Sequence, residues 1–153
     1  MKKKLFLIFT LVCISTILLG AEKSKEEYLN DLSSDDVETV VAAETWLGSK
    51  KEKKAVEKLV DLNKNSSSKE IRLNAAVALG LIGDKNTVDG LIDQLLVERN
   101  ADVRYALVLA ITRIGIKTKA QLEKLEQAGQ NESDPLVLDY LQKIKEKIEK
   151  KAK

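Results

Sequence analysis

Apolar residues recur through most of the chain at the spacing of one face of an α-helix. In residues 69–83 they lie three and four positions apart, so they form a single stripe on a helix of 3.6 residues per turn. This stripe consists of Ile71, Ala75, Ala78, Leu79 and Ile82. The next segment continues with Val88, Leu91, Ile92 and Leu95. Two amphipathic helices joined by a short polar stretch predict an antiparallel helix pair.

The pattern repeats after 32 residues, because residues 69–83 align with residues 101–115 without a gap. The matching positions are Ile71 and Val103, Arg72 and Arg104, Leu79 and Ile111, Ile82 and Ile114, and Gly83 and Gly115. Weaker copies lie around residues 37–48 and 134–148. A single helix pair leaves one apolar face uncovered, so repeats of this length predict a stack of pairs, an α-solenoid.

Small polar residues predict where the helices begin, and glycines predict where they end. A Ser, Thr or Asn with an acid or amide three positions later has the spacing of a capping box. Such pairs are Ser24 and Glu27, Ser33 and Asp36, Ser49 and Glu52, Ser67 and Glu70, Asn86 and Asp89, and Thr118 and Gln121. Pro135 suits a first helical position. Helix ends are expected at Gly48, Gly83, Gly115 and Gly129.

The motif Ile71-Arg72, Ala75-Ala76, Leu79-Gly80, Ile82-Gly83-Asp84 resembles the short HEAT-like repeats of the phycobilisome-lyase type. The resemblance covers roughly residues 34–148 and is most specific in the second copy. It implies an all-α solenoid in which the second helix of each pair lines a concave, partner-binding face. A tetratricopeptide array has a similar period, and Trp46-Leu47-Gly48 matches part of its motif. However, the Tyr, Ala and Pro positions of that family are missing.

Together these patterns predict one all-α domain of antiparallel helix pairs behind an export signal. Helices are expected at about 25–32, 35–47, 51–63, 69–82, 86–98, 102–114, 119–128 and 135–149. The predicted regions are a signal peptide at 1–21, an N-terminal capping helix region at 22–33, HEAT-like repeats at 34–149 and a basic tail at 150–153. The repeats divide at about 34–65, 66–99, 100–132 and 133–149, the last as a half-repeat cap.

Residues 1–21 have the three parts of a secretory signal peptide. Lysines at 2–4 precede an uncharged run from Leu5 to Leu19, and small residues at 20–21 precede Glu22. The run is shorter than the roughly 20 residues of a membrane span. We therefore expect export, with a periplasmic location, after cleavage at Ala21. Lipid attachment at Cys13 is the less favoured alternative, because the residues before it are not small.

Removal of residues 1–21 changes the chemistry available to the chain. It removes the only cysteine and three lysines, which leaves 23 basic residues, 24 acidic residues, and no Cys or His. Cys/His zinc sites and Ser-His or Cys-His nucleophiles are then excluded. A nucleic-acid partner is not expected without a concentrated basic surface. We predict no catalytic, metal or cofactor site, and the few aromatic residues fit poorly with holding a tetrapyrrole.

We predict that the chain acts as a scaffold or adaptor that binds another protein. The candidate site is a strip of four carboxylates on the predicted second helices, spaced four residues apart on the side away from the apolar stripe. They are Glu57, Asp61, Asp89 and Asp93. The alternative is that these are ordinary solvated side chains, since about a quarter of a soluble domain is charged.

Three further side chains have predicted roles. Arg72 and Arg104 share a repeat position, and we expect them to pair with Asp84 or Asp102 and to tie adjacent repeats together. Trp46 is expected to fill the core. Tyr105 is added to the candidate partner-binding residues, because an exposed tyrosine suits an interface.

Two other functions remain open from the sequence. A ligand carrier or a carboxylate-only enzyme would need a closed pocket with paired acids. Attachment to a membrane surface would use the Lys-rich segment from Lys143 onward, which is more simply a solvated capping helix. The sequence predicts neither the identity of the partner nor the oligomeric state.

Overall fold

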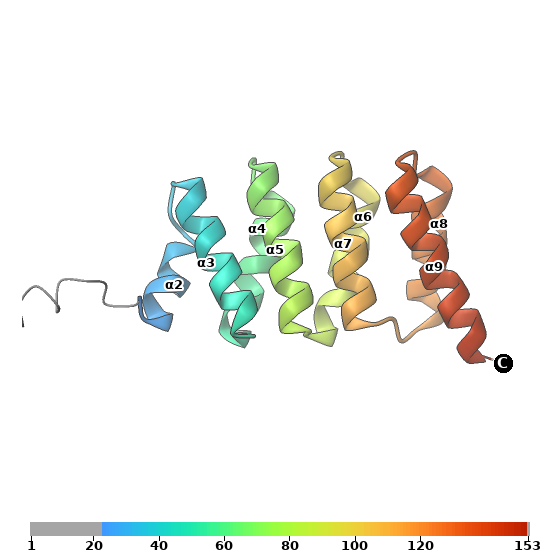
Figure 1. The fold of residues 1–153 in the computed structure, drawn as a ribbon, viewed down its shortest axis with the longest axis horizontal. Coiled ribbons are helices and arrows are strands. Elements are labelled where there is room, and N and C mark those ends of the chain that lie inside the picture. The colour runs from blue at the N-terminus through green and yellow to red at the C-terminus, as the bar shows by residue number, and fades with distance from the viewer. Residues whose placement is uncertain (1–22, 153) are drawn as a thin grey trace, which may run out of the picture.

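The computed structural model describes residues 23–152 and shows a row of α-helices (Figure 1). The predicted signal peptide and Cys13 lie outside the described residues. No strand occurs within residues 23–152. The sequence prediction of an all-α solenoid is confirmed.

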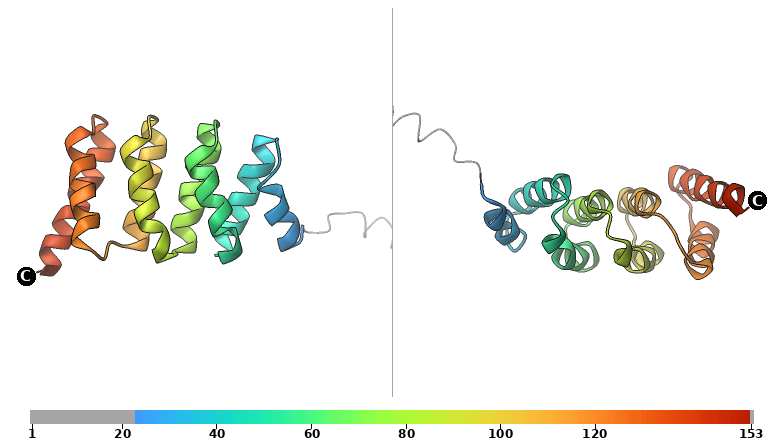
Figure 2. Two further views of the ribbon diagram at one scale, coloured as in Figure 1. Left: turned by 180° about the vertical axis from the view of Figure 1, so that it is seen from behind. Right: turned by 90° about the horizontal axis from the view of Figure 1, so that it is seen from below.

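The helices alternate between two layers. In chain order the elements are α2 (Lys25–Asp31), α3 (Val37–Ser49), η1 (Lys53–Ala55), α4 (Val56–Asn65), α5 (Lys69–Ile82), η2 (Lys85–Thr87), α6 (Val88–Val97), α7 (Ala101–Ile114), α8 (Lys119–Asn131) and α9 (Pro135–Ala152). We call α3, α5, α7 and α9 the first helices and α4, α6 and α8 the second helices. Figure 2 shows the first helices in one layer and the second helices in the other.

Several helices begin at side-chain caps that the sequence indicates. Ser24 and Thr118 form full capping boxes with the third residue of α2 and α8. The boxes predicted at Ser33 and Ser67 do not form, because the cap of α3 is Asp36 and that of α5 is Ser68. Gly83 ends α5 in the left-handed region, with φ 77°.

The second helices α4 and α6 begin later than the sequence predicts. Each is preceded by one turn of 3₁₀-helix, and the side chains of Glu52 and Asp84 accept backbone hydrogen bonds at the start of those turns. Gly48 and Gly129 were expected at helix ends, and this prediction is wrong. Both lie inside helices, and Gly48 is buried because its lack of a side chain lets α5 approach α3.

The first helices pack closely on one another, whereas α4, α6 and α8 make few mutual contacts. A Cβ atom placed on Gly48 would lie 2.8 Å from the Cα of Ala78, and one on Gly80 would lie 2.9 Å from the Cα of Ala110. The tightest contacts of the fold therefore lie between first helices.

Substitution of a glycine at the α5–α7 contact and of one outside it should have opposite effects on stability. We expect Gly80→Ala to lower the free energy of unfolding by about 1–3 kcal/mol, because the new methyl group meets the backbone of Ala110. Gly90 lies in α6 with open space at its Cβ position, so Gly90→Ala should raise it by up to about 1 kcal/mol. Urea unfolding of both variants measures the difference. Equal effects would contradict the packing described for Gly80.

Candidate functional site

All four carboxylates of the predicted acidic strip are exposed on second helices, but they are not equally available. Two lie on α6 and contact α8. Asp89 accepts a hydrogen bond from Nε2 of Gln121 at 3.2 Å, and Asp93 forms an ion pair with Nζ of Lys124 at 2.6 Å. The other two, Glu57 and Asp61, lie on α4, where Asp61 accepts a hydrogen bond from Nδ2 of Asn65 at 2.7 Å and lies 3.9 Å from Nζ of Lys58. The strip is thus partly neutralised at its α6 end.

Tyr105 does not belong to the same surface as the acidic strip. It lies half-buried on the first helix α7, and its ring meets that of Tyr140 on α9 edge-on, with centroids 5.1 Å apart. Trp46 is also half-buried and stacks on Tyr28 of α2 at 4.3 Å. The tryptophan therefore joins the N-terminal helix to the stack and does not simply fill the core.

Arg72 links the second helix pair to the loops at either end of it. Its Nε and Nη2 donate to the two carboxylate oxygens of Glu98 at 2.8 and 3.0 Å. Its Nη1 donates to the backbone carbonyls of Ser66 and Ser67 at 3.0 and 3.2 Å. A guanidinium with this fork geometry satisfies a carboxylate and two carbonyls at once.

Arg104 makes the same arrangement one repeat later. It donates to Glu132 at 2.7 and 2.8 Å, and its Nη1 donates to the carbonyls of Glu98 and Arg99 at 3.4 and 2.9 Å. The side chains of Glu98 and Glu132 are each only 3% exposed. We call these two interactions the Arg–Glu clamps.

The prediction that the arginines pair with Asp84 or Asp102 is wrong. Asp84 caps the η2 turn, and Asp102 is exposed, with Lys69 at 3.9 Å. Glu98 and Glu132 each directly follow a second helix, and this shared position could have identified them as the partners. They lie 34 residues apart, so an alignment with a strict 32-residue period does not place them together.

The clamps set the ionisation of their carboxylates. Burial alone would raise the pKa of Glu98, but hydrogen bonds from Arg72 and the backbone amide of Asn100 outweigh it and lower the pKa. The hydrogen bond from Arg104 lowers the pKa of Glu132 against the effect of burial. Both carboxylates are therefore held in the charged form.

An exposed apolar groove lies on the first helices between α5 and α7. Val77 and Leu109 occupy equivalent positions and are 42% and 37% exposed. The groove has a volume of about 360 Å³ and is lined by Val77, Gly80, Leu81, Ala106, Leu109, Ala110, Thr112 and Arg113. Sequence analysis missed it, although the two aliphatic residues stand 32 positions apart. Exposed apolar patches on a soluble fold mark candidate interaction surfaces.

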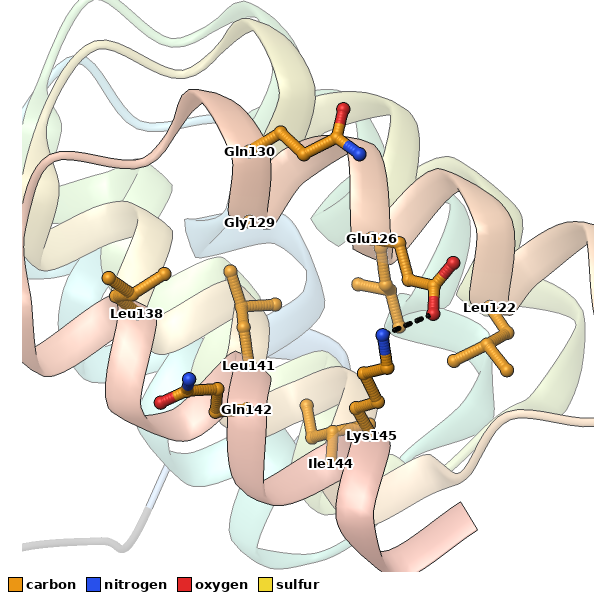
Figure 3. Close-up of a pocket in the computed structure, with 10 residues that line it drawn as sticks. Leu122, Glu126, Gly129, Gln130, Leu138, Leu141, Gln142, Ile144 and Lys145 are labelled. Atoms are coloured by element: carbon orange, nitrogen blue, oxygen red, sulfur yellow. Dashed lines mark ion pairs between the residues drawn. The ribbon is translucent and has the colours of Figure 1, made fainter. Parts of the chain in front are cut away.

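A second groove lies between α8 and α9 (Figure 3). Its volume is about 250 Å³, and Leu122, Leu141 and Ile144 contribute apolar side chains to it. An ion pair of 3.0 Å between Lys145 and Glu126 spans the two helices. The grooves found in the described part of the chain have volumes from 210 to 370 Å³ and are open to solvent. None of these is the closed cavity that a ligand carrier would need.

Within residues 23–152, no group of three or more Cys, His, Asp or Glu side chains is arranged to hold a metal ion. No described helix combines the length and apolar character needed to cross a membrane. Two lysines of α9 are engaged within the fold, since Lys143 pairs with Asp139 at 2.6 Å and Lys145 pairs with Glu126.

Glu44 is a fully buried acid on α3 without a hydrogen-bond partner for either carboxylate oxygen. The equivalent residues of the next two repeats are Ala76 and Val108, both buried. Burial raises the pKa of Glu44 to about 8 because the charged form would lose its hydration. Its side chain therefore stays protonated at neutral pH in the folded protein.

Removal of one partner of a clamp should be strongly destabilising. We expect Arg72→Ala to lower the free energy of unfolding by about 3 kcal/mol, because Glu98 is left buried and unpaired. Arg99→Ala, at an exposed arginine nearby, is the matched control and should change stability little. The double variant Arg72→Ala/Glu98→Ala should recover part of the loss in chemical unfolding. Additive losses would mean that the pair is not coupled.

Glu44 predicts a loss of stability as pH rises. The unfolded chain releases this proton near the ordinary glutamate pKa of 4.5, whereas the folded protein holds it to about pH 8. Between these values the unfolded state binds fewer protons, so the free energy of unfolding falls with increasing pH. In Glu44→Gln this decline should be reduced, while Glu38→Gln, at an exposed position of α3, should keep it. Thermal unfolding at pH 5, 6.5 and 8 measures the slope, and identical slopes would refute the assignment.

Comparison with known proteins places this geometry in a family. The model for HEAT repeats matches residues 26–112 and, in a second register, residues 56–142. No curated protein matches the chain. Among solved structures, the chain is similar to one from the complex of CpcE and CpcF of phycocyanin lyase from Nostoc sp. PCC7120. The sequence identity is 28%, the TM-score is 0.62, and the alignment covers 82% of this chain and 55% of that one.

The chain thus spans about half the length of that similar structure. Because the similar structure is described as a lyase, the comparison gives no support to the prediction that this chain is not an enzyme. The all-α repeat fold is supported by both comparisons. The chain belongs to the family of HEAT repeat proteins.

Proposed function

We propose that this protein is an exported scaffold that binds a protein partner on its first helices, across the groove between α5 and α7. The observation that carries the proposal is the pair of exposed aliphatic side chains, Val77 and Leu109, on adjacent and closely packed helices. Export is proposed from the residue pattern at positions 1–21. A role in protein interaction also agrees with the similar structure, which is a complex of CpcE and CpcF.

The physical character of the groove suits an interface. Its walls are aliphatic, and the exposed Arg113 lies at its edge, so an apolar centre meets a polar rim as in many protein–protein contacts. Gly80 and Ala110 hold α5 and α7 close together at its floor. A partner would therefore meet a surface that is formed before binding, which reduces the entropy lost on association.

In this proposal the acidic strip is a secondary contact. Asp89 and Asp93 already interact with α8, so binding through them would have to compete with Gln121 and Lys124. The contacts of Asp61, with Asn65 and Lys58, lie within α4 and do not involve a neighbouring helix. Glu57 and Asp61 are therefore the carboxylates of the strip that we propose for contact with a partner.

A lyase-like activity is the second candidate, because the similar structure belongs to a phycocyanin lyase. On this chain such chemistry would rely on carboxylates, since residues 23–152 contain no Cys or His. A saturable change in the absorption spectrum of an added linear tetrapyrrole would favour this candidate over a scaffold.

Site-specific photo-crosslinking in native cells tests the proposed binding face. A crosslinking amino acid in place of Leu109 should give a discrete product with another protein. The comparison position is Val97, an exposed valine on the second helix α6, and it should give much less of that product. Leu109→Asp should reduce capture of the same partner at least tenfold without loss of helical content.

Products from Val97 alone would place the binding face on the second helices. The absence of any protein product from either position, with the protein folded and present in the cell, would contradict a scaffold function.

A further inference from the structure

A groove of about 360 Å³ lies at the N-terminal end of the stack, where α3 begins, α4 ends and α5 begins. Its lining includes the α2–α3 loop at Ser34 and Asp35, the buried Val40, and Asp61 and Ser66 near the end of α4. It therefore reaches one end of the acidic strip. It lies apart from the apolar groove between α5 and α7.

This groove occupies the position that an Arg–Glu clamp fills in the next repeat. Addition of 32 to Val40 gives Arg72, and addition of 32 to Ser66 gives Glu98. The first repeat thus carries an aliphatic residue in place of the arginine and a small hydroxyl in place of the carboxylate. In the second and third repeats both charged side chains are present and in contact.

The hydrogen-bond acceptors of a clamp have equivalents in the first repeat. Arg72 binds the carbonyls of Ser66 and Ser67, and the equivalent carbonyls belong to Ser34 and Asp35, which line the groove. No residue lining the groove is basic. Residues equivalent to both carbonyl acceptors therefore line the groove, and the first repeat, residues 34–65, contains no arginine.

The charge around the groove favours a cation. Asp35 and Asp61 are exposed carboxylates on its lining, and α4 points its C-terminal, partly negative end toward it. Asp61 also accepts a hydrogen bond from Asn65 and lies 3.9 Å from Nζ of Lys58. The guanidinium of Arg72, which contacts the carbonyls of Ser66 and Ser67, is balanced by Glu98. Val37 and Val40 offer apolar contact for an aliphatic stem. A planar guanidinium matches two neighbouring carbonyls better than the single ammonium of lysine does.

We propose that this groove binds an arginine side chain supplied by a protein partner, which completes in trans the clamp that the first repeat lacks. The proposal rests on the proposed function in that the arginine comes from a bound protein. It adds the chemistry of that partner: a segment with an exposed arginine that reaches the N-terminal end of the stack.

The test is a titration of the ¹⁵N-labelled protein, residues 22–153, with N-acetyl-arginine amide followed by NMR. Saturable shifts are expected at backbone amides around residues 34–40 and 61–68. N-acetyl-lysine amide should bind at least fivefold more weakly. N-acetyl-citrulline amide, which has nearly the same shape without the charge, should cause no saturable shift. Equal responses to all three compounds, or no response to arginine, would overturn the proposal.

Two sets of variants separate the groove from the rest of the surface. Val40→Arg/Ser66→Glu rebuilds the clamp from the chain's own residues and should abolish the response to arginine. If that variant does not fold, Asp61→Asn serves instead and should weaken arginine binding at least threefold. Asp93→Asn, at the equivalent position of the second repeat, is the matched control and should leave binding unchanged. Undiminished binding by the folded clamp variant, or by Asp61→Asn, would refute the assignment.

This experiment and the crosslinking experiment fail independently. The titration needs no partner and reports only on the groove. Crosslinking from Leu109 reports on a partner at a different surface. A silent titration beside a positive crosslink would remove the arginine site and leave the scaffold function standing.

Discussion

The close approach of the first helices determines how the two faces of the stack differ. Glycine on one helix faces alanine on the next at Gly48 and Ala78 and again at Gly80 and Ala110, so the backbones nearly touch. The second helices contact one another less than the first helices do. The stack therefore has one tight face with a shallow aliphatic groove and one looser face that carries acids.

The sequence predicted the fold well because a helical stripe and a 32-residue period are local, additive signals. Of the capping boxes that it predicted, those at Ser24 and Thr118 form, whereas α3 and α5 are capped by Asp36 and Ser68. It failed where the answer depended on spacing between repeats. The partners of Arg72 and Arg104 lie 26 and 28 residues away across a loop of variable length, and exposure of Val77 and Leu109 depends on how closely α5 and α7 pack. The exposure of the four carboxylates of the acidic strip was expected. The contacts of Asp89 with Gln121 and of Asp93 with Lys124 were not, because they depend on how α6 packs against α8.

The clamps show how repeats of this kind can differ in function without differing in fold. Each clamp joins a first helix to the loop before it and to the residue after its own second helix, so it closes one repeat and touches the next. A repeat without the clamp keeps its helices and its loop carbonyls. In the first repeat, where Val40 and Ser66 stand at the two clamp positions, a groove lies at this place.

The buried Glu44 is one of several features that lower the stability of the first repeat. In a linear stack each repeat is stabilised mainly by its neighbours, so the weakest unit sets where cooperative unfolding starts. The first repeat has a neighbour on one side only beyond the short helix α2, lacks a clamp, and contains a carboxyl group without a hydrogen-bond partner. Both ends of the row have a neighbour on one side only, and the missing clamp and the buried carboxyl group further weaken the N-terminal end. A protein that binds the N-terminal end would stabilise the first repeat. Because each repeat is stabilised by its neighbours, the helices that follow would also open less often.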